Sequence, residues 1–155
     1  MSKIRINPFG AQLLGTFFYV GYFPFAPGSA ASLLGLGLVL LLRGNPLLYV
    51  LVALAVLFLG FVTASRLEAA VGKKDPSCVV IDEVAGSFLA FFMLPPQPSV
   101  IITAFFLFRA FDMFKIYPMD KLEALPGGAG VMMDDIVAGI YTNVVMQIAL
   151  RWVGV

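Results

Sequence analysis

The sequence predicts an all-α fold, a polytopic membrane bundle of about five spanning helices with an additional interfacial or re-entrant helix near the N-terminus. Composition is the first observation: 61% of the 155 residues are hydrophobic and 12% are charged, whereas soluble domains have roughly 45–50% apolar and about 25% charged residues. The second is that several apolar stretches approach the roughly 17–25 residues of a spanning helix. At this length, residues 1–155 are expected to form a single membrane-embedded domain.

Turn-forming sequence divides the apolar segments from one another. The breaks are "RGNP" at 43–46, "PPQP" at 95–98 and the long stretch "KIYPMDKLEALPGGAG" at 115–130, all rich in residues that end helices. Five predicted spans follow from these breaks, and they cover residues 29–42, 47–64, 78–94, 99–111 and 136–153.

The N-terminal apolar stretch, residues 9–25, is interrupted by Pro24 and followed by Pro27, so we expect an interfacial or re-entrant helix here. If this helix does not cross the membrane and the N-terminus is cytoplasmic, Arg43 and Arg151 are the only basic residues expected on the non-cytoplasmic side. This asymmetry agrees with the positive-inside tendency. The basic residues expected on the cytoplasmic side are Lys3, Arg5, Arg66, Lys73, Lys74, Arg109, Lys115 and Lys121.

Absent residue types narrow the chemistry. The chain has no histidine, which excludes a Ser-His-Asp triad, a phosphohistidine intermediate and histidine metal ligands. A single cysteine, Cys78, excludes a disulfide framework and a thiolate zinc cluster. A formal net charge of +1 gives no reason to expect a nucleic-acid partner. Carboxylate, hydroxyl, lysine and arginine chemistry remains.

Two acidic pairs lie at the start of similar segments, "DEVAG" at 82–86 and "DIVAG" at 135–139. We expect each pair at a helix start, followed by small residues that let helices approach closely. Adjacent anions repel each other, and four carboxylates together would suit a hard cation, magnesium above all. Stabilisation by the helix dipole or by nearby basic residues is the alternative. The four acids are Asp82, Glu83, Asp134 and Asp135.

Opposite charge comes from "FRAFDMFK" at 108–115, where Arg109, Asp112 and Lys115 are spaced three apart and therefore share one side of a helix. These three residues are predicted to form a phosphate clamp, in which Asp112 orients a basic partner or binds metal. The alternative is a ladder of ion pairs at the membrane surface, with the long side chains reaching toward water.

Two glycine-containing loops each allow two interpretations. "PFAPGSAAS" at 24–32 suits either a helix cap or an anion-binding turn. "PGGAG" at 126–130 suits either close approach to a ligand or a sharp turn. Downstream of Asp135, a helical stripe at four-residue spacing contains Asn143 and Gln147, which we expect to serve helix packing.

Together these segments resemble the phosphatidylglycerophosphatase A family. The resemblance rests on "APGS" at 26–29, "DEVAG" at 82–86, "FRAFDMFKIYP" at 108–118 and "GGAGVMMDDIVAG" at 127–139, and the last two are specific in combination. It implies a magnesium-dependent phosphatase of the bacterial inner membrane that converts phosphatidylglycerophosphate into phosphatidylglycerol and inorganic phosphate. The active site would then face the cytoplasm.

Three positions depart from the family pattern: Ser29 replaces a common threonine, Ala31 a frequent glycine and Ile116 the first proline after the lysine. No charged position is missing. The hypothesis that follows assigns three roles. The expected metal ligands are Asp82, Glu83, Asp134 and Asp135. The expected phosphate-binding residues are Pro27, Gly28, Ser29, Arg109 and Lys115, and the expected catalytic residues are Glu83, Arg109, Asp112 and Lys115.

Two routes of hydrolysis stay open. Water can attack the phosphate directly, with Glu83 as a further ligand or as the base, or an aspartate can attack and form an aspartyl-phosphate. The main alternative function is a small ion- or proton-coupled transporter, which predicts carboxylates near mid-bilayer rather than near helix ends. A structural subunit gives no reason for these charges to converge. The alcohol phosphotransferase signature is absent, because no aspartate is followed by glycine.

Overall fold

A computed structural model describes residues 8–154, and the predictions for Lys3 and Arg5 therefore lie outside the described residues. Over this range the chain folds into α-helices and one short 3-10 helix, with no strand, so the all-α prediction is confirmed. In chain order the elements are α1 (Pro8–Gly15), η1 (Val20–Tyr22), α2 (Pro27–Leu42), α3 (Pro46–Val71), α4 (Ile81–Ala90), α5 (Pro98–Phe114), α6 (Met119–Glu123) and α7 (Gly128–Val153).

Local sequence explains where the long helices begin and end. α2, α3 and α5 each have proline in the first turn, where its missing N–H would have no helical partner anyway. Asn45 caps α3, because its side chain accepts a hydrogen bond of 3.1 Å from the backbone N–H of Leu48. α3 ends at Val71 and is capped by Gly72, whose φ of 68° is left-handed.

Two helices, α3 and α7, are long and apolar enough to cross a membrane by length and composition. Each has 26 residues and is therefore about 39 Å long. The prediction of five spans is not confirmed, since α2 is a shorter apolar helix of 16 residues and α4 has only 10. The N-terminal stretch likewise contains only the short α1 and η1.

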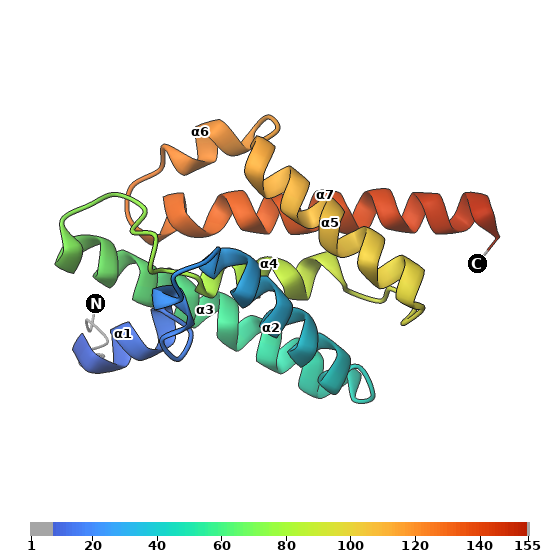
Figure 1. Ribbon diagram of the computed structural model, residues 1–155, viewed down its shortest axis with the longest axis horizontal. Coiled ribbons are helices and arrows are strands. Elements are labelled where there is room, and N and C mark those ends of the chain that lie inside the picture. Colours follow the sequence, from blue (N-terminus) through green and yellow to red (C-terminus); the bar gives the residue numbers. More distant parts are fainter. Residues whose placement is uncertain (1–7, 155) are drawn as a thin grey trace.

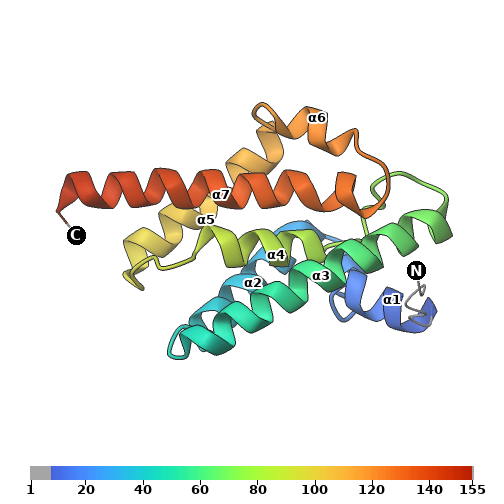
Figure 2. The same cartoon turned by 180° about the vertical axis from the view of Figure 1, so that it is seen from behind.

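α4 lies in the middle of the bundle, flanked by α2, α3 and α7 (Figures 1 and 2). Its crossing with α7 depends on Gly86 and Gly139. A Cβ at Gly86 would meet the backbone carbonyl of Asp135 at 2.8 Å, and a Cβ at Gly139 would collide with the backbone carbonyl of Gly86. The prediction that small residues let these two helices approach is confirmed.

The start of α7 corrects the sequence prediction. We expected Asp134 and Asp135 at the beginning of a helix, but α7 begins at Gly128 and places both acids in its second turn. The glycines of "PGGAG" allow this earlier start, because Gly127 has φ 65° and a Cβ at Gly128 would collide with a backbone carbonyl of α3. The turn interpretation of this loop is therefore supported, and the helix dipole does not explain the acids.

The polar stripe on α7 faces the end of α4. The Asn143 side chain donates hydrogen bonds to the backbone carbonyls of Ala90 at 3.2 Å and Phe92 at 2.7 Å, and Gln147 donates to Phe92 at 3.5 Å. These carbonyls would otherwise lack partners where α4 ends. The packing role expected for both amides is confirmed.

Candidate active site

Three carboxylates from two helices meet beside the α4–α7 crossing. Asp82 and Glu83 come from the first turn of α4, and Asp135 comes from α7. One oxygen from each lies within 4.8 Å of the others. Asp82 and Asp135 are 7% and 2% exposed, while Glu83 is partly buried. We call these three residues the carboxylate cluster.

Each member of the carboxylate cluster has one buried oxygen that lacks a hydrogen-bond partner among the described residues: Asp82 Oδ1, Glu83 Oε2 and Asp135 Oδ1. A buried, unpaired carboxylate oxygen is energetically costly, and three together are more so because the charges repel. A cation among them would satisfy all three. An all-oxygen donor set fits a hard divalent cation such as Mg²⁺ or Ca²⁺ better than a soft metal.

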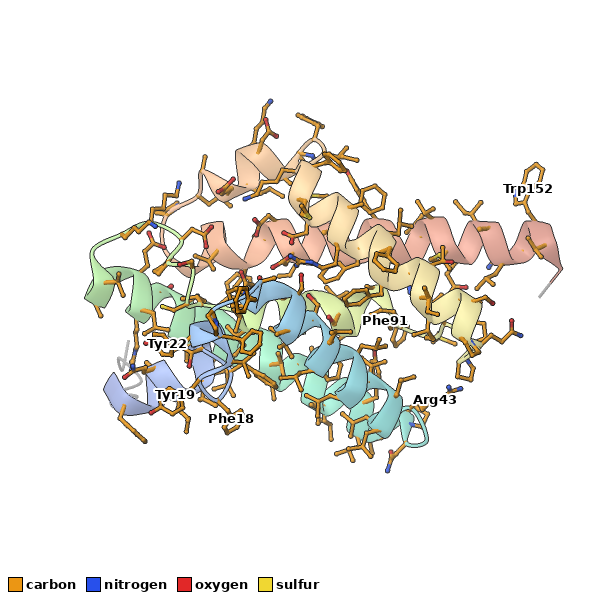
Figure 3. All side chains as sticks on the ribbon, viewed as in Figure 1. Phe18, Tyr19, Tyr22, Arg43, Phe91 and Trp152 are labelled. Atoms are coloured by element: carbon orange, nitrogen blue, oxygen red, sulfur yellow. The ribbon has the colours of Figure 1, made fainter. Side chains whose placement is uncertain are left out.

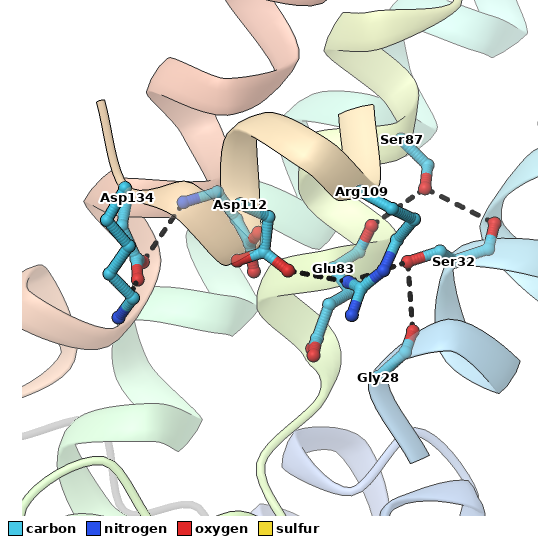
Figure 4. Close-up of polar contacts among 9 residues, drawn as sticks. Gly28, Ser32, Glu83, Ser87, Arg109, Asp112 and Asp134 are labelled. Carbon is cyan, nitrogen blue, oxygen red and sulfur yellow. Dashed lines mark hydrogen bonds and ion pairs between the residues drawn. The ribbon is translucent and has the colours of Figure 1, made fainter. Parts of the chain in front are cut away.

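Asp134, the fourth acid predicted as a metal ligand, is not a member of this cluster. Its Oδ2 lies 3.1 Å from Lys115 Nζ, and its Oδ1 accepts a hydrogen bond of 3.0 Å from the backbone N–H of Asp135. Figure 4 shows Asp134 set apart from Glu83, with Asp112 between them. Its role as a ligand stays a prediction.

The predicted clamp residues Arg109, Asp112 and Lys115 lie together along the end of α5. Arg109 Nη1 lies 2.7 Å from Asp112 Oδ2, and the carboxyl group of Asp112 is within hydrogen-bonding reach of Asp135. Asp112 therefore connects the guanidinium to the carboxylate cluster. The Nε of Arg109 is buried and has no hydrogen-bond partner within the described range, which leaves a donor directed into the protein interior at this site.

Lys115 ends α5 in a left-handed conformation, with φ 44° and ψ 58°, which is uncommon for a residue with a side chain. Its ammonium group binds Glu123 at 2.9 Å as well as Asp134 at 3.1 Å. Burial by itself would lower the pKa of Lys115, but hydrogen bonds and charges from these two acids outweigh it and hold the pKa above its usual range. Lys115 is therefore a permanent cation at physiological pH.

The start of α2 reaches the same site. A Cβ at Gly28 would collide with the carboxylate of Glu83 and lie 3.5 Å from Arg109 Nη2, so a larger residue here would have to displace the Glu83 carboxylate. Ser32, one turn later, donates to the Gly28 carbonyl at 2.9 Å and accepts from Arg109 Nη1 at 3.4 Å. Figure 4 shows Gly28 and Ser32 facing Glu83 and Arg109. Pro27 and Ser29 lie in the same turn, partly buried, and their phosphate-binding role stays a prediction.

Sequence reasoning missed two acids of this region. Glu123 reaches Lys115 from α6, a helix within the stretch expected to be a loop. Asp75 lies in the loop after α3, where burial raises its pKa above the usual range and the charge of Lys115 partly opposes that shift. Neither acid belongs to a helical stripe or a paired motif, so the sequence carried no signal for them.

Comparison with known proteins identifies the family of the chain. The sequence model described as Phosphatidylglycerophosphatase A matches residues 13–150. The chain belongs to the phosphatidylglycerophosphatase A family. Relatives named phosphatidylglycerophosphatase A occur in Haemophilus influenzae, 35% identical over 98% of this chain and 95% of the relative, and in Escherichia coli, 32% identical over 90% and 82%.

A further relative, from Bacteroides thetaiotaomicron, is 42% identical over 91% of this chain and 93% of its own length, and it carries the provisional name phosphatidylinositol-3-phosphatase. No solved structure matches the chain. Membership of the phosphatidylglycerophosphatase A family makes this protein an enzyme, a phosphoric monoester hydrolase. The alternative function as a transporter is therefore not favoured.

Proposed function

We propose that the protein hydrolyses phosphatidylglycerophosphate to phosphatidylglycerol and inorganic phosphate, with magnesium as cofactor. The observation that carries the proposal is the convergence of three carboxylates, each with an unpaired buried oxygen, beside Arg109 and Lys115. Acids alone would repel an anionic phosphate, and cations alone would bind it without a means of hydrolysis. The family match supplies the class of reaction.

Asp82, Glu83 and Asp135 are the proposed magnesium ligands, and Asp134 is a fourth candidate that holds Lys115. When bound, magnesium would offset the charge of the phosphate and stabilise the charge that develops during phosphoryl transfer. Magnesium is the choice among hard cations because it commonly binds through a few carboxylates together with substrate phosphates.

Arg109 and Lys115 are proposed to bind the phosphate oxygens, with Asp112 holding the Arg109 guanidinium in place at 2.7 Å. Gly28 lets the start of α2 lie directly against the Glu83 carboxylate, and Gly28, Pro27 and Ser29 of this turn are proposed to complete the phosphate-binding site.

In the reaction, a water oxygen bonds to phosphorus as the bond from phosphorus to the glycerol oxygen breaks. Glu83 accepts the water proton, and the glycerol oxygen leaves with a proton from solvent. An aspartyl-phosphate route differs in one measurable way. In a single turnover in ¹⁸O-water, direct attack places the isotope in phosphate alone. Isotope in an enzyme carboxylate, which arises when water attacks the carbonyl carbon of an aspartyl-phosphate, would therefore contradict direct attack.

The proposed setting is the bacterial inner membrane, with several membrane passes and the active site facing the cytoplasm. α3 and α7 supply apolar length. Lys115 contacts Asp134 near the start of α7, whereas Arg151 lies in the last turn of that helix and lines one cavity together with Arg43. This charge distribution agrees with the positive-inside tendency. A cysteine-free Cys78→Ser background tests it, since a cysteine at Lys121 should react with a membrane-impermeant thiol reagent only from the cytoplasmic side and one at Arg43 only from the other.

The substrate is tested by phosphate release from purified enzyme with a panel of lipid phosphates: phosphatidylglycerophosphate, phosphatidic acid and phosphatidylinositol-3-phosphate. The last is included because the Bacteroides relative is named for it. We expect the enzyme to prefer phosphatidylglycerophosphate. We also expect chelator to abolish phosphate release and magnesium to restore it. Preference for the inositol lipid would replace the proposed headgroup, and full activity in excess chelator would remove magnesium from the mechanism.

A further inference from the structure

A cavity lies at the end of the bundle opposite the carboxylate cluster. It has a volume of about 680 Å³ and is bounded by the end of α2, the start of α3, the loop after α4 and the last turns of α7. Its walls are mainly apolar, and they include Val39, Tyr49 and Leu150. Two guanidinium groups, of Arg43 and Arg151, belong to exposed residues that also line it.

The charge around this cavity is of one sign. All nine acids of the chain lie between positions 68 and 135, in elements that meet at the active-site end of the bundle. Among the described residues the cavity lining contains no acid, so none of them offers Arg43 or Arg151 a carboxylate partner there. An unopposed arginine pair at the edge of an apolar cavity fits an anion that has an apolar body.

The distance along α7 separates this cavity from the reaction. Arg151 follows Asp135 by sixteen positions along the helix, which corresponds to about 24 Å at the rise of an α-helix. The hydrocarbon core of a bilayer is about 30 Å thick. If α7 spans the membrane as proposed above, the two sites therefore meet lipids of opposite leaflets.

We propose that this cavity binds an anionic glycerophospholipid from the leaflet opposite the active site. The lipid phosphate binds Arg43 and Arg151, and an acyl chain occupies the space between α2, α3 and α7. A zwitterionic lipid is disfavoured, because its ammonium group would meet two cations and no acid. A free inorganic anion is disfavoured as well, because it would leave the apolar walls without a partner. The inference rests on the membrane placement in the proposed function, but not on the identity of the substrate.

The chain contains a fluorescent reporter at this end of the bundle, next to the cavity in sequence but not in its lining. Trp152 is the only tryptophan; it follows Arg151 directly and is 88% exposed. Figure 3 shows Arg43 and Trp152 toward the same end of the molecule. Bromine on an acyl chain quenches tryptophan fluorescence only at close range, so lipid bound at the active site would not be detected.

The experiment compares quenching by brominated phosphatidylglycerol and brominated phosphatidylcholine in full-length enzyme reconstituted with mixtures of the two lipids. We expect phosphatidylglycerol to be preferred by about tenfold, the value of one charge-assisted hydrogen bond. The double variant Arg43→Gln, Arg151→Gln should lower the preference to about one, and the matched Arg43→Lys, Arg151→Lys variant should keep most of it. Equal quenching by both lipids in the wild type, or an unchanged preference in the glutamine variant, would overturn the proposal.

A separate pair of matched variants tests whether an acyl chain occupies the cavity. Val50 lines the cavity, whereas its neighbour Leu51 does not, and both are exposed on α3. Val50→Phe should lower the phosphatidylglycerol retained in native mass spectrometry several-fold, and Leu51→Phe should not; equal retention would refute the acyl-chain assignment. All variants should keep the phosphatase rate of the wild type. Loss of activity toward every lipid phosphate, with the lipid preference intact, would instead contradict the proposed function alone.

Discussion

Replacing Asp135 by asparagine should have opposite effects on activity and on the stability of the metal-free enzyme. Oxygens of Asp135, Asp82 and Glu83 lie within 4.8 Å of one another. At this distance and an effective dielectric constant of about 20, each ionised pair repels by about 3.5 kcal/mol. Asp135→Asn removes two such pairs, so about 7 kcal/mol of repulsion would be relieved if all three acids were ionised at this distance. Protonation of the cluster in the metal-free wild type reduces the measurable gain.

The assay measures unfolding temperature and phosphate release in the same detergent, with excess chelator or saturating magnesium. In chelator, the variant should unfold at a higher temperature than the wild type. Magnesium should raise the unfolding temperature of the wild type more than that of the variant. The rate of the variant should fall at least about a hundredfold, since charge stabilisation by a bound metal contributes several kcal/mol.

Asp120→Asn is the matched control. Asp120 is an exposed acid of α6 and is not a member of the carboxylate cluster, so the same change there should leave the rate and the magnesium response unaltered. Wild-type turnover by Asp135→Asn, or equal stabilisation of both proteins by magnesium, would refute the metal-site reasoning.

Three further predictions concern packing and charge. Gly86→Ala should lower the free energy of unfolding by about 1–3 kcal/mol, because its Cβ would lie 2.7 Å from a phenyl ring and 2.8 Å from a carbonyl of α7. Gly37→Ala should not lower it, because a Cβ there would have nothing within 4 Å. Chemical denaturation measures both variants. Lys115→Gln should reduce kcat/KM about tenfold to a hundredfold through a lost charge-assisted contact with phosphate, and Glu123→Gln should reduce it less, because Asp134 still holds the ammonium; an equal loss in both variants would contradict this. Asp75→Asn should stabilise the protein at neutral pH, and thermal unfolding at several pH values checks the sign: burial raises the Asp75 pKa, so its favourable contribution is complete below the unfolded value of about 3.9 and is lost as pH rises through the folded value. A gain that persists unchanged at the lowest pH would count against burial as its cause.

Much of the site followed from residue type and spacing. The three-residue spacing of Arg109, Asp112 and Lys115 was sufficient to place them along one side of a helix, because helical periodicity is local. The two acidic pairs were recognisable because adjacent carboxylates are costly without a partner. Sequence could not reveal that Asp134 and Asp135 diverge, one toward Lys115 and one toward Asp82, because consecutive helical residues point about 100° apart and only the neighbouring helices decide what each one meets.

The sequence by itself determined that the chain is helical, apolar and charged in a few recurring segments. Apolar composition, prolines at helix starts and short motifs are properties of the chain that need no partner. The tertiary structure alone decided that α4 is a short, enclosed helix, that α7 begins at Gly128, and that α6 brings Glu123 to Lys115. These outcomes depend on contacts between residues far apart in the chain. The close approach of α4 and α7 at Gly86 and Gly139 brings Asp82 and Asp135 into one site.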